Sequence, residues 1–404
     1  MVGEWRDITL GDFVALQRGH DLTEPERRIG HVPVMGSAGQ NGFHDTALAK
    51  GPGIVIGRSG ASFGQVHFSK EDFWPHNTGL YVTDFKDNDP LFAFYFLKAL
   101  DFDRFNSGSA QPSLNRNFIY PIPIRVPKPK EQKAIAAVLG ALDDKIELNR
   151  RMNATLEATA RALFQSWFVD FDPVRAKLDG HTPTGMDAAT AALFPEHLEE
   201  SSLGHIPKGW RACTLGDIAK NVSITFDFKR TPEVVFINTG DVLEGDFLHS
   251  KRSAHAGLPG QAKKSIRHDD ILFSEIRPAN KRYAYVDFDS SDYVVSTKFM
   301  IIRGSKEIHP RLLYRILTAK ETLDEFQVQA ESRSGTFPQI TFDSICHLPI
   351  VLPPIDIQEA FQRAVGKMDA QIKVNKQQSG TLAILRDTLL PKLLSGELPV
   401  VSTL

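Results

Sequence analysis

Two long stretches of this chain carry the same spacing of apolar residues. In residues 131–168 the apolar positions fall on two seven-residue ladders, separated by alternating steps of three and four. This spacing keeps one narrow apolar stripe along a helix and is typical of a coiled-coil seam. Residues 357–394 repeat the pattern at an offset of 226 residues, without a gap. Because such a stripe needs a partner, we predict that the two helices pair with each other.

The seam includes one polar rung. Asn149 and Asn375 occupy the same ladder position, where a buried Asn costs stability but penalises misregistered pairing. In an antiparallel pair equivalent rungs need not touch, so these residues could face Ser379 and Asn153, or a partner protein. Two ordinary amphipathic helices packed in a core are the alternative interpretation. The residues expected at the seam or in partner docking are Leu139, Leu142, Ile146, Asn149, Leu156, Leu163, Val365, Met368, Ile372, Asn375, Leu382 and Leu389.

An internal repeat extends beyond the helices. Residues 5–12 read WRDITLGD and residues 210–217 read WRACTLGD, while residues 111–132 align with 337–358 through shared Pro, Ile and Gln positions. The offset grows from 205 to 226 residues, so the second copy holds about 21 extra residues. The predicted order is a first domain (1–130), a helix (131–168), a connector (169–209), a second domain (210–355), a second helix (356–396) and a tail (397–404).

Short alternating runs bounded by Gly and Pro predict strands in both domains. The predicted strands are 54–56, 65–68 and 80–83 in the first copy, and 234–237, 271–273, 283–286 and 299–302 in the second. Residues 90–105 and 310–329 have helical spacing. We therefore expect the α+β class: two strand-rich domains separated by two long helices that form a coiled coil with each other, in a pseudo-twofold internal repeat.

The connector differs from both domains. Pro173, Pro183, Pro195 and Pro207 are spaced through it, which forbids a long helix.

The chain has 404 residues and a formal net charge of −2, so its total charge does not indicate nucleic-acid binding. Local clusters of basic residues would have to provide the binding surface. No apolar run approaches the roughly 20 residues of a membrane helix, and the first residues do not resemble a signal peptide. We expect a soluble, cytoplasmic protein.

Motifs for catalysis are missing from the sequence. The Gly-rich run 57–64 lacks the Lys-Ser/Thr ending of a phosphate-binding loop and the spacing of a dinucleotide fingerprint, so a turn between strands is the preferred interpretation. Zinc-protease, serine-hydrolase and base-methyltransferase motifs do not occur. Cys213 and Cys346 lie far apart without metal-ligand spacing, so no metal site is expected. We predict no catalytic residues in this chain.

Polar and basic side chains in loops are candidates for contacts with DNA, because base edges and phosphates are bound by Arg, Lys, Asn, Gln and Ser. A solvated polar rim is the alternative for each of them. The densest group of cations lies in residues 251–282. The candidates are Arg18, Gln40, Asn41, Arg58, Ser59, Gln111, Lys251, Arg252, Lys263, Lys264, Arg277, Lys281 and Arg282.

Taken together, the repeat, the connector and the helices resemble the DNA specificity (S) subunit of type I restriction–modification systems. The resemblance is carried by the twice-occurring Trp-x-x-x-Thr-Leu-Gly-Asp opening, by the Ile-Pro-Ile…Pro…Gln passage into a long helix, and by the central segment from Phe171 to Trp210. It covers essentially the full sequence.

This resemblance implies a function in DNA recognition. Each domain would bind one half of a split, asymmetric DNA site. The two long helices would form an antiparallel coiled coil that acts as a spacer, and the chain would itself perform no chemistry. It implies double-stranded DNA, two methylation (M) subunits and, in the full complex, restriction (R) subunits as partners. S-adenosylmethionine and ATP would then be bound by those subunits, with no cofactor on this chain. Members of the family differ most in the domain loops, so individual contact residues are not carried over, apart from Arg58 as a possible contact.

Two other classes of function stay open. The chain could be a coiled-coil scaffold whose two domains bind proteins, which nonspecific behaviour with every DNA tested would favour. It could also be a solitary nuclease or methyltransferase, which modification of DNA by the purified chain alone would establish.

Overall fold

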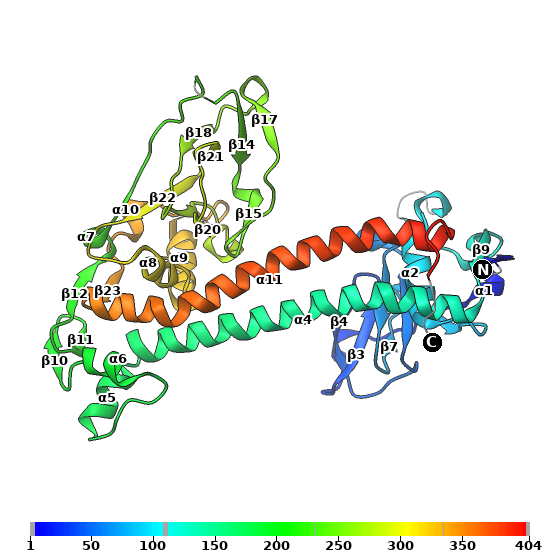
Figure 1. The fold of residues 1–404 in the computed structure, drawn as a ribbon, viewed down its shortest axis with the longest axis horizontal. Helices are drawn as coiled ribbons and strands as arrows, with labels where there is room; N and C mark the ends of the chain where they lie inside the picture. The colour runs from blue at the N-terminus through cyan, green and yellow to red at the C-terminus, as the bar shows by residue number, and fades with distance from the viewer. Residues whose placement is uncertain (1–4, 108–111, 230, 334, 401–404) are drawn as a thin grey trace. The chain divides into compact units, whose positions relative to one another are not determined.

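The computed structural model describes residues 5–107, 112–229, 231–333 and 335–400. The chain forms two compact units, one made of Met1–Asn153 with Ile372–Leu404 and the other of Ala154–Gln371. Both long helices pass from one unit into the other, so each unit holds one strand-rich domain and part of each helix (Figure 1). Among the described residues, no helix combines the length and apolar character needed to cross a membrane.

Unit 1 contains two small sheets and a strand pair. The central sheet has the order β2-β8-β5-β6, and a second sheet has the order β4-β3-β7. The strands are β1 (Trp5–Thr9), β2 (Ala15–Arg18), β3 (Val32–Gly36), β4 (Gly39–His44), β5 (Gly53–Gly57), β6 (Val66–Ser69), β7 (Trp74–Pro75), β8 (Gly79–Asp84) and β9 (Pro123–Pro127), and the helices are α1 (Leu10–Phe13), α2 (Pro90–Ala99) and α3 (Arg116–Ile119). Strand β1 pairs with β9, which brings the start of the domain next to its end.

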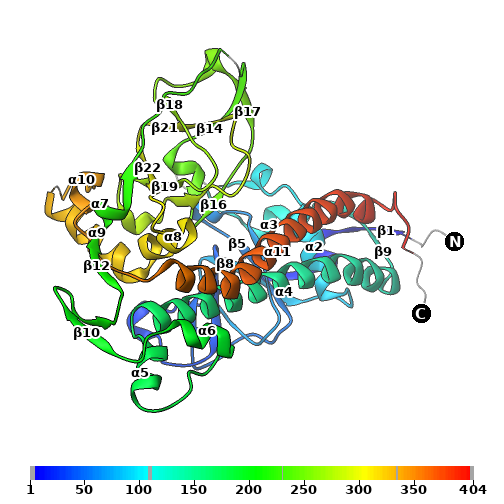
Figure 2. The ribbon, with the colours of Figure 1, turned by 60° about the vertical axis from the view of Figure 1, so that its left-hand side comes forward.

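Unit 2 repeats this plan. Its central sheet has the order β13-β22-β19-β20, and its second sheet has the order β17-β14-β21-β18, with the strands of the second sheet grouped at the top of Figure 2. The strands are β12 (Arg211–Thr214), β13 (Ala219–Asn221), β14 (Glu233–Ile237), β15 (Val242–Leu243), β16 (Asp246–Phe247), β17 (Arg252–Ala254), β18 (Ala262–Ser265), β19 (Ile271–Ser274), β20 (Tyr283–Tyr285), β21 (Tyr293–Ser296), β22 (Phe299–Gly304) and β23 (Pro349–Leu352), and the helices are α7 (Leu215–Ile218), α8 (Pro310–Thr318), α9 (Lys320–Arg333) and α10 (Phe342–Ile345).

The predicted internal repeat is visible in the pairing of the strands. Strand β3 pairs in parallel with β7, and β14 pairs in parallel with β21. The second copy adds β18 at the edge of its outer sheet and the β15–β16 hairpin before β17. These additions lie in the region where the sequence offset grows. The strands predicted from the alternating pattern are confirmed, with ends that differ by a residue or two.

The Thr-Leu-Gly-Asp sequence forms the same structure in both units. Thr9 and Thr214 cap one-turn helices, α1 and α7, through a reciprocal capping box with Asp12 and Asp217. The hydrogen bonds with these threonines hold the pKa of both carboxyls below the usual range. The repeated motif therefore encodes a helix start that ends the first strand of each domain.

Two helix predictions were wrong in their extent. The helical spacing over residues 90–105 continues past Ala99, but α2 ends there and only a short 3-10 turn, Asp103–Phe105, follows. The stretch 310–329 forms two helices, α8 and α9, because Ala319 adopts an extended conformation between them. Apolar spacing shows which face of a helix is buried, but it does not reveal that a single extended residue interrupts the helix.

The long helices are α4 (Pro129–Phe168) and α11 (Ile355–Ser395). In unit 1 they lie side by side in opposite directions (Figure 1): Asp143 forms an ion pair with Arg386 at 2.5 Å, and Asn153 accepts a hydrogen bond from Asn375 at 2.8 Å. In unit 2 the same direction of pairing brings Phe168 against Phe361, with ring centroids 4.8 Å apart. The predicted antiparallel pairing and the α+β class are confirmed.

Every predicted seam residue is buried or half-buried. Leu139, Asn149, Val365 and Asn375 are buried most completely. The Asn149 amide donates to Gln378 at 2.9 Å and to Ser379 at 3.3 Å, while Asn375 binds Asn153. Of the arrangements left open by the sequence, the one in which the polar rungs face Ser379 and Asn153 is therefore correct.

A buried glutamine joins each domain to its long helix. Gln132 in the first turns of α4 accepts a hydrogen bond from the Asp89 backbone amide at 2.9 Å and donates to Asn88 and Pro127. Gln358 occupies the equivalent place in α11 and accepts from the His309 amide at 2.7 Å. Both side chains are completely buried. Each glutamine thus binds the start of the main domain helix, α2 or α8, to the long helix.

The connector contains only short elements, as the prolines predicted. These are α5 (Asp172–Leu178), α6 (Ala188–Leu193), β10 (Leu198–Ser201) and β11 (Gly204–Pro207). An aromatic cluster within unit 2 fixes the connector to α4, with the Trp167 ring 5.1 Å from Phe194 and the Phe171 ring 5.6 Å from Trp210. Gly396 follows α11 with a φ of +77°, the left-handed conformation in which a glycine commonly ends a helix.

Candidate nucleic-acid interface

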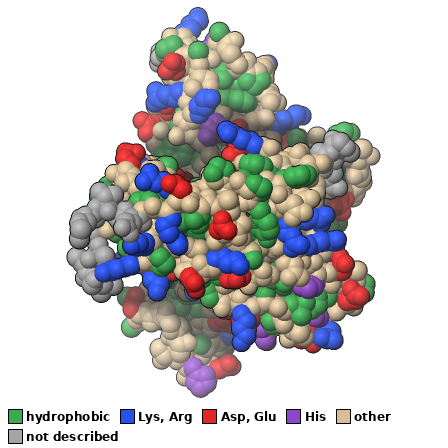
Figure 3. Space-filling model, turned by 90° about the vertical axis from the view of Figure 1, so that its right-hand side faces the viewer, with side chains coloured by type: hydrophobic (Ala, Val, Ile, Leu, Met, Phe, Trp, Pro, Cys, Tyr) green, Lys and Arg blue, Asp and Glu red, His purple; other side chains and the backbone are tan. Residues whose placement is uncertain are grey.

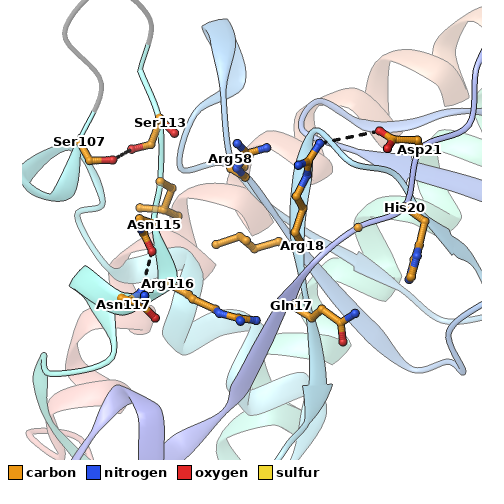
Figure 4. A pocket seen from close by; sticks show the side chains of 13 residues that line it. Gln17, Arg18, His20, Asp21, Arg58, Ser107, Ser113, Asn115, Arg116 and Asn117 are labelled. Carbon is orange, nitrogen blue, oxygen red and sulfur yellow. Dashed lines mark hydrogen bonds and ion pairs between the residues drawn. The ribbon is translucent and has the colours of Figure 1, made fainter.

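The first domain has a polar recess of about 640 Å³ near the ends of β2 and β5. Figure 4 shows the side chains of Arg18, Arg58 and Arg116 around it, from β2, from the residue after β5, and from α3. The remaining lining residues are Gln17, Gly19, His20, Asp21, Leu80, Ser107, Ser113, Leu114, Asn115 and Asn117. Guanidinium, amide and hydroxyl groups therefore dominate the lining, with Leu80 and Leu114 as its apolar residues.

Main-chain hydrogen bonds hold the recess open. The Arg58 amide donates to the Thr78 carbonyl at 2.9 Å, and the Leu114 amide donates to the Arg58 carbonyl at 2.8 Å. The backbone of Arg58 thus bridges the central sheet and the segment before α3. Arg116 is held as well, because its Nη1 donates to the Leu16 carbonyl at 2.8 Å. The Arg58 backbone is thus fixed on both sides, and the Arg116 guanidinium group is fixed by its own hydrogen bond.

The recess is locally cationic although the chain is not. Its lining holds three arginines and one carboxylate, Asp21, which lies 3.8 Å from Arg18 in an exposed ion pair. Exposed pairs of this kind are weak and are screened by salt. The face drawn in Figure 3 mixes Lys and Arg with Asp and Glu, as expected for a net charge of −2. A cluster of three guanidinium groups is therefore a local feature suited to acceptor-rich ligands such as nucleic acid.

Some of the residues predicted in the first domain come together in this recess. Arg18 and Arg58 line it, and Ser59 is next to it, in a β-bridge with Ser113. Gln40 and Asn41 lie elsewhere, on the exposed strand β4, where Asn41 accepts hydrogen bonds from Arg27. Gln111 lies outside the described residues. No observation tests these residues as DNA contacts, so they stay predictions.

Most of the basic residues predicted in the second domain have partners within unit 2. Arg252 pairs with Asp292 at 2.5 Å, and Lys281 pairs with Glu244 at 2.6 Å. Lys264 and Arg282 donate to backbone carbonyls of Phe299, and of Gly240 and Val242. The other predicted cations, Lys251, Lys263 and Arg277, are exposed. Clustering along the sequence therefore did not produce one cationic cluster in the domain.

Arg116 and its neighbours Asn115 and Asn117 were missing from the predicted set. They lie in the sequence Ser113-Leu-Asn-Arg-Asn, which supplies Asn115 as the side-chain cap of α3. The sequence shows a polar, basic segment here, and that was the available signal. Its proximity to Arg58 could not be predicted, because it depends on the backbone bond between residues 58 and 114.

A metal site requires several ligating side chains that lie close together. Among the described residues, no group of three or more His, Cys, Asp or Glu side chains could hold a metal ion. The strongly shifted tyrosines are structural: burial raises the pKa of Tyr283 to about 12, and burial followed by a hydrogen bond to Asp143 raises the pKa of Tyr95. These groups lie inside packing contacts, so they serve the fold.

The fold and the site define a class of protein in which one α+β domain occurs twice, each copy leads into an arm of a helix pair, and a polar recess lies on a domain surface. The chain belongs to the family described as the type I restriction modification DNA specificity domain, whose family model matches residues 3–158 and 207–382.

Individual relatives agree with this assignment. The chain is 49% identical over 181 residues to the HindI specificity subunit of Haemophilus influenzae, an alignment that covers 45% of this chain and 39% of that protein. It is 27% identical over 304 residues to the MjaIX specificity subunit of Methanocaldococcus jannaschii, covering 73% and 65%. The aligned regions thus span less than two thirds of either relative.

A solved structure has the same fold. The type I S subunit from M. genitalium superposes with a TM-score of 0.58 at 16% identity, and the match covers 97% of this chain and 96% of that one. At this identity the similarity concerns the fold alone.

Proposed function

We propose that this chain is the DNA-recognition subunit of a type I restriction–modification complex. Each of its two domains binds one half of a bipartite DNA site. The main support is the family membership of both halves of the chain. The cationic recess of the first domain supplies a surface of the right chemistry.

The site read by the two domains is asymmetric in this proposal. The copies share their sheet order but differ by β18 and the β15–β16 hairpin, and the three arginines of the recess belong to the first copy. Two copies with different surface side chains present different hydrogen-bonding groups to the bases. Different half-sites follow from that difference.

The helix pair serves as the spacer between the half-sites. A helix of 40 residues, such as α4, is about 60 Å long at 1.5 Å per residue, which is comparable to roughly one and a half turns of B-DNA. The polar contacts of Asn149 and Asn375 support one register of the pair.

The long helices also dock two methylation subunits. Apolar side chains that the pairing leaves exposed support this proposal, namely Leu148 and Met152 on α4, and Val374, Ile384 and Leu385 on α11. The predicted domain division, with two recognition domains, two spacer helices and a connector, belongs to the same proposal.

The chain itself does no chemistry in this proposal. S-adenosylmethionine and ATP bind to the methylation and restriction subunits, and this chain contributes the choice of sequence. Part of the contact with the DNA phosphates comes from the partners, which agrees with a net charge of −2.

Single-molecule mapping of modified adenines tests the proposal. Cells that express this chain with its methylation partners should carry one bipartite methylated sequence that disappears when the gene for this chain is deleted. A methylation pattern that is the same with and without the chain, while the partner genes are expressed, would refute the proposed function.

A further inference from the structure

One residue in each domain occupies the same place at the end of the central strand. In unit 1, β5 lies between β6 and β8, with Ile56 opposite Val66 and Leu80. In unit 2, β19 lies between β20 and β22, with Phe273 opposite Tyr283 and Met300. Two residues after these positions come Arg58 and Glu275. The strand registers therefore make Arg58 and Glu275 equivalent.

The main-chain hydrogen bonds of the two residues are also the same. The Arg58 amide donates to Thr78 at 2.9 Å and its carbonyl accepts from Leu114 at 2.8 Å. The Glu275 amide donates to Lys298 at 3.1 Å and its carbonyl accepts from Ile340 at 2.9 Å. Both backbones are thus fixed on two sides, by the residue that precedes strand β8 or β22 and by the segment before the short helix α3 or α10.

The next residue continues the equivalence. Ser59 forms a β-bridge with Ser113, and Ile276 forms one with Gln339. Identical backbone positions direct the side chains at 58 and 275 in the same way relative to their own sheets. What differs is the charge: a guanidinium group in the first domain and a carboxylate in the second.

The surroundings of the two side chains differ accordingly. Arg58 shares its recess with Arg18 and Arg116. Glu275 is half-buried, and no ion pair links it to any residue that the structure describes. The charge of the nearby Lys264 interacts with the Glu275 carboxylate, but its Nζ donates to the Phe299 carbonyl at 2.7 Å. The carboxylate therefore keeps its acceptor capacity.

A carboxylate on a DNA-binding surface can make few favourable contacts. Phosphates repel it, and the acceptor edges of guanine and thymine offer it no donor. The exocyclic amino groups do, and Glu or Asp accepts most characteristically from cytosine N4 in the major groove. An arginine prefers the opposite partners, guanine N7 and O6 or phosphate oxygens.

We propose that Arg58 and Glu275 occupy equivalent positions in the two copies of the domain and recognise DNA with side chains of opposite charge. Glu275 reads an exocyclic amino group, that of cytosine, in the half-site of the second domain. Arg58 binds an acceptor of DNA, either a guanine edge or a phosphate, in the half-site of the first. The shared scaffold presents the same backbone position in both domains, and the single side chain on it selects donors or acceptors. This inference rests on the proposed function.

The test uses the complex assembled with its methylation subunits and two charge-removing variants, Glu275→Gln and Arg58→Gln. Matched controls are Glu307→Gln and Arg125→Gln, which remove exposed charges that lie outside the recess and away from the end of β19. Thermal unfolding of each variant first verifies that it folds. Methylated sequences are then mapped by single-molecule sequencing, and affinities are measured with duplexes substituted at every position of the wild-type site.

Glu275→Gln should lower discrimination at one base pair of one half-site by tenfold or more and leave the other half unchanged. Arg58→Gln should act in the opposite half. A guanine contact appears as relaxed discrimination at one position, whereas a phosphate contact appears as a uniform loss of affinity with a salt dependence reduced by about one unit. The controls should keep the wild-type pattern.

The proposal would be overturned if the affinities of the Glu275→Gln complex for the duplexes followed the wild-type order, even if its methylation activity were reduced. Equal loss in both half-sites would overturn it too. If the wild-type complex itself methylates no bipartite sequence, the proposed function fails rather than this inference, so the two failures are distinguishable.

Discussion

Asn153 and Asn375 meet inside the helix pair of unit 1. Their side chains are 9% and 3% exposed, and the Asn375 amide donates to the Asn153 carbonyl oxygen at 2.8 Å. A polar contact in an apolar seam stabilises only the register in which both partners meet. The cost of removing one partner is therefore larger than the net contribution of the bond.

Asn153→Ala should lower the free energy of unfolding by roughly 1–3 kcal/mol, because it removes a buried acceptor of the Asn375 amide. The double variant Asn153→Leu, Asn375→Leu should recover part of that loss, since both polar groups are then replaced by apolar ones. Chemical denaturation measures both values, with the exposed Glu157→Ala as control. A double variant that is less stable than Asn153→Ala would contradict the assigned contact.

We expect the stability of unit 2 to depend on pH through His309. Burial lowers the pKa of this imidazole from 6.5, and its neutral Nδ1 accepts a hydrogen bond from the Arg311 amide at 3.3 Å, at the start of α8. A folded-state pKa below the unfolded value means that the unfolded chain binds the proton more readily. The contribution of the neutral His309 side chain to the stability of unit 2 is therefore fully present above pH 6.5, and it is lost as the pH falls below that value.

His309→Asn should reduce the difference in melting temperature between about pH 7.5 and about pH 5.5, because Asn keeps a cap acceptor but does not titrate in this range. The matched control is His347→Asn at an exposed position, which should retain the wild-type difference. A pH dependence that is the same in His309→Asn and wild type would show that other groups cause it.

At the scale of single elements, the two long helices were predicted well, but the role of the buried glutamine in each of them was not. Their heptad pattern predicted the helices and their pairing, and the structure gives their bounds within about two residues of the predictions. The repeat alignment also matched Gln132 with Gln358, but it gave no reason for the match. The reason is a hydrogen-bonding role that depends on the domain helices α2 and α8, which lie about 40 residues away in the sequence.

Gln132→Ala should destabilise unit 1 by roughly 2 kcal/mol or more, because it removes the hydrogen bonds of Gln132 with the Asp89 amide, the Pro127 carbonyl and the Asn88 side-chain oxygen. The loss should appear as faster hydrogen exchange at the start of α2, and not in the domain of unit 2. Gln358→Ala should accelerate hydrogen exchange at the start of α8, and not in the domain of unit 1. The exposed Lys133→Ala serves as control, and an equal effect of Gln132→Ala on both domains would contradict the local role.

For the whole molecule, the spacer role makes a geometric prediction. Inserting four helical residues into α4 alone lengthens it by about 6 Å and shifts its seam relative to α11. The complex should then recognise a site with a changed gap, or lose methylation. The same insertion in the connector between Gly180 and Gly185, where both glycines have positive φ, should leave the site unchanged. A wild-type methylated sequence after insertion into α4 would contradict the spacer role.

The sequence by itself determined the periodic and repeated features of this protein. Heptad ladders, the Thr-Leu-Gly-Asp starts and the Pro-rich connector are local patterns, and local patterns follow from the backbone geometry of a helix or turn. They were sufficient for the fold class, the pairing of the two helices and the family resemblance, and the resemblance in turn implied the antiparallel direction.

Only the tertiary structure decided which polar residues lie together. Arg18, Arg58 and Arg116 are separated by dozens of residues, and they meet because β2 and β5 end, and α3 begins, at one place. The opposite happened in residues 251–282, where cations close in sequence are divided among separate strands and ion pairs. A binding surface depends on long-range strand register, and a single sequence does not specify that register to the residue.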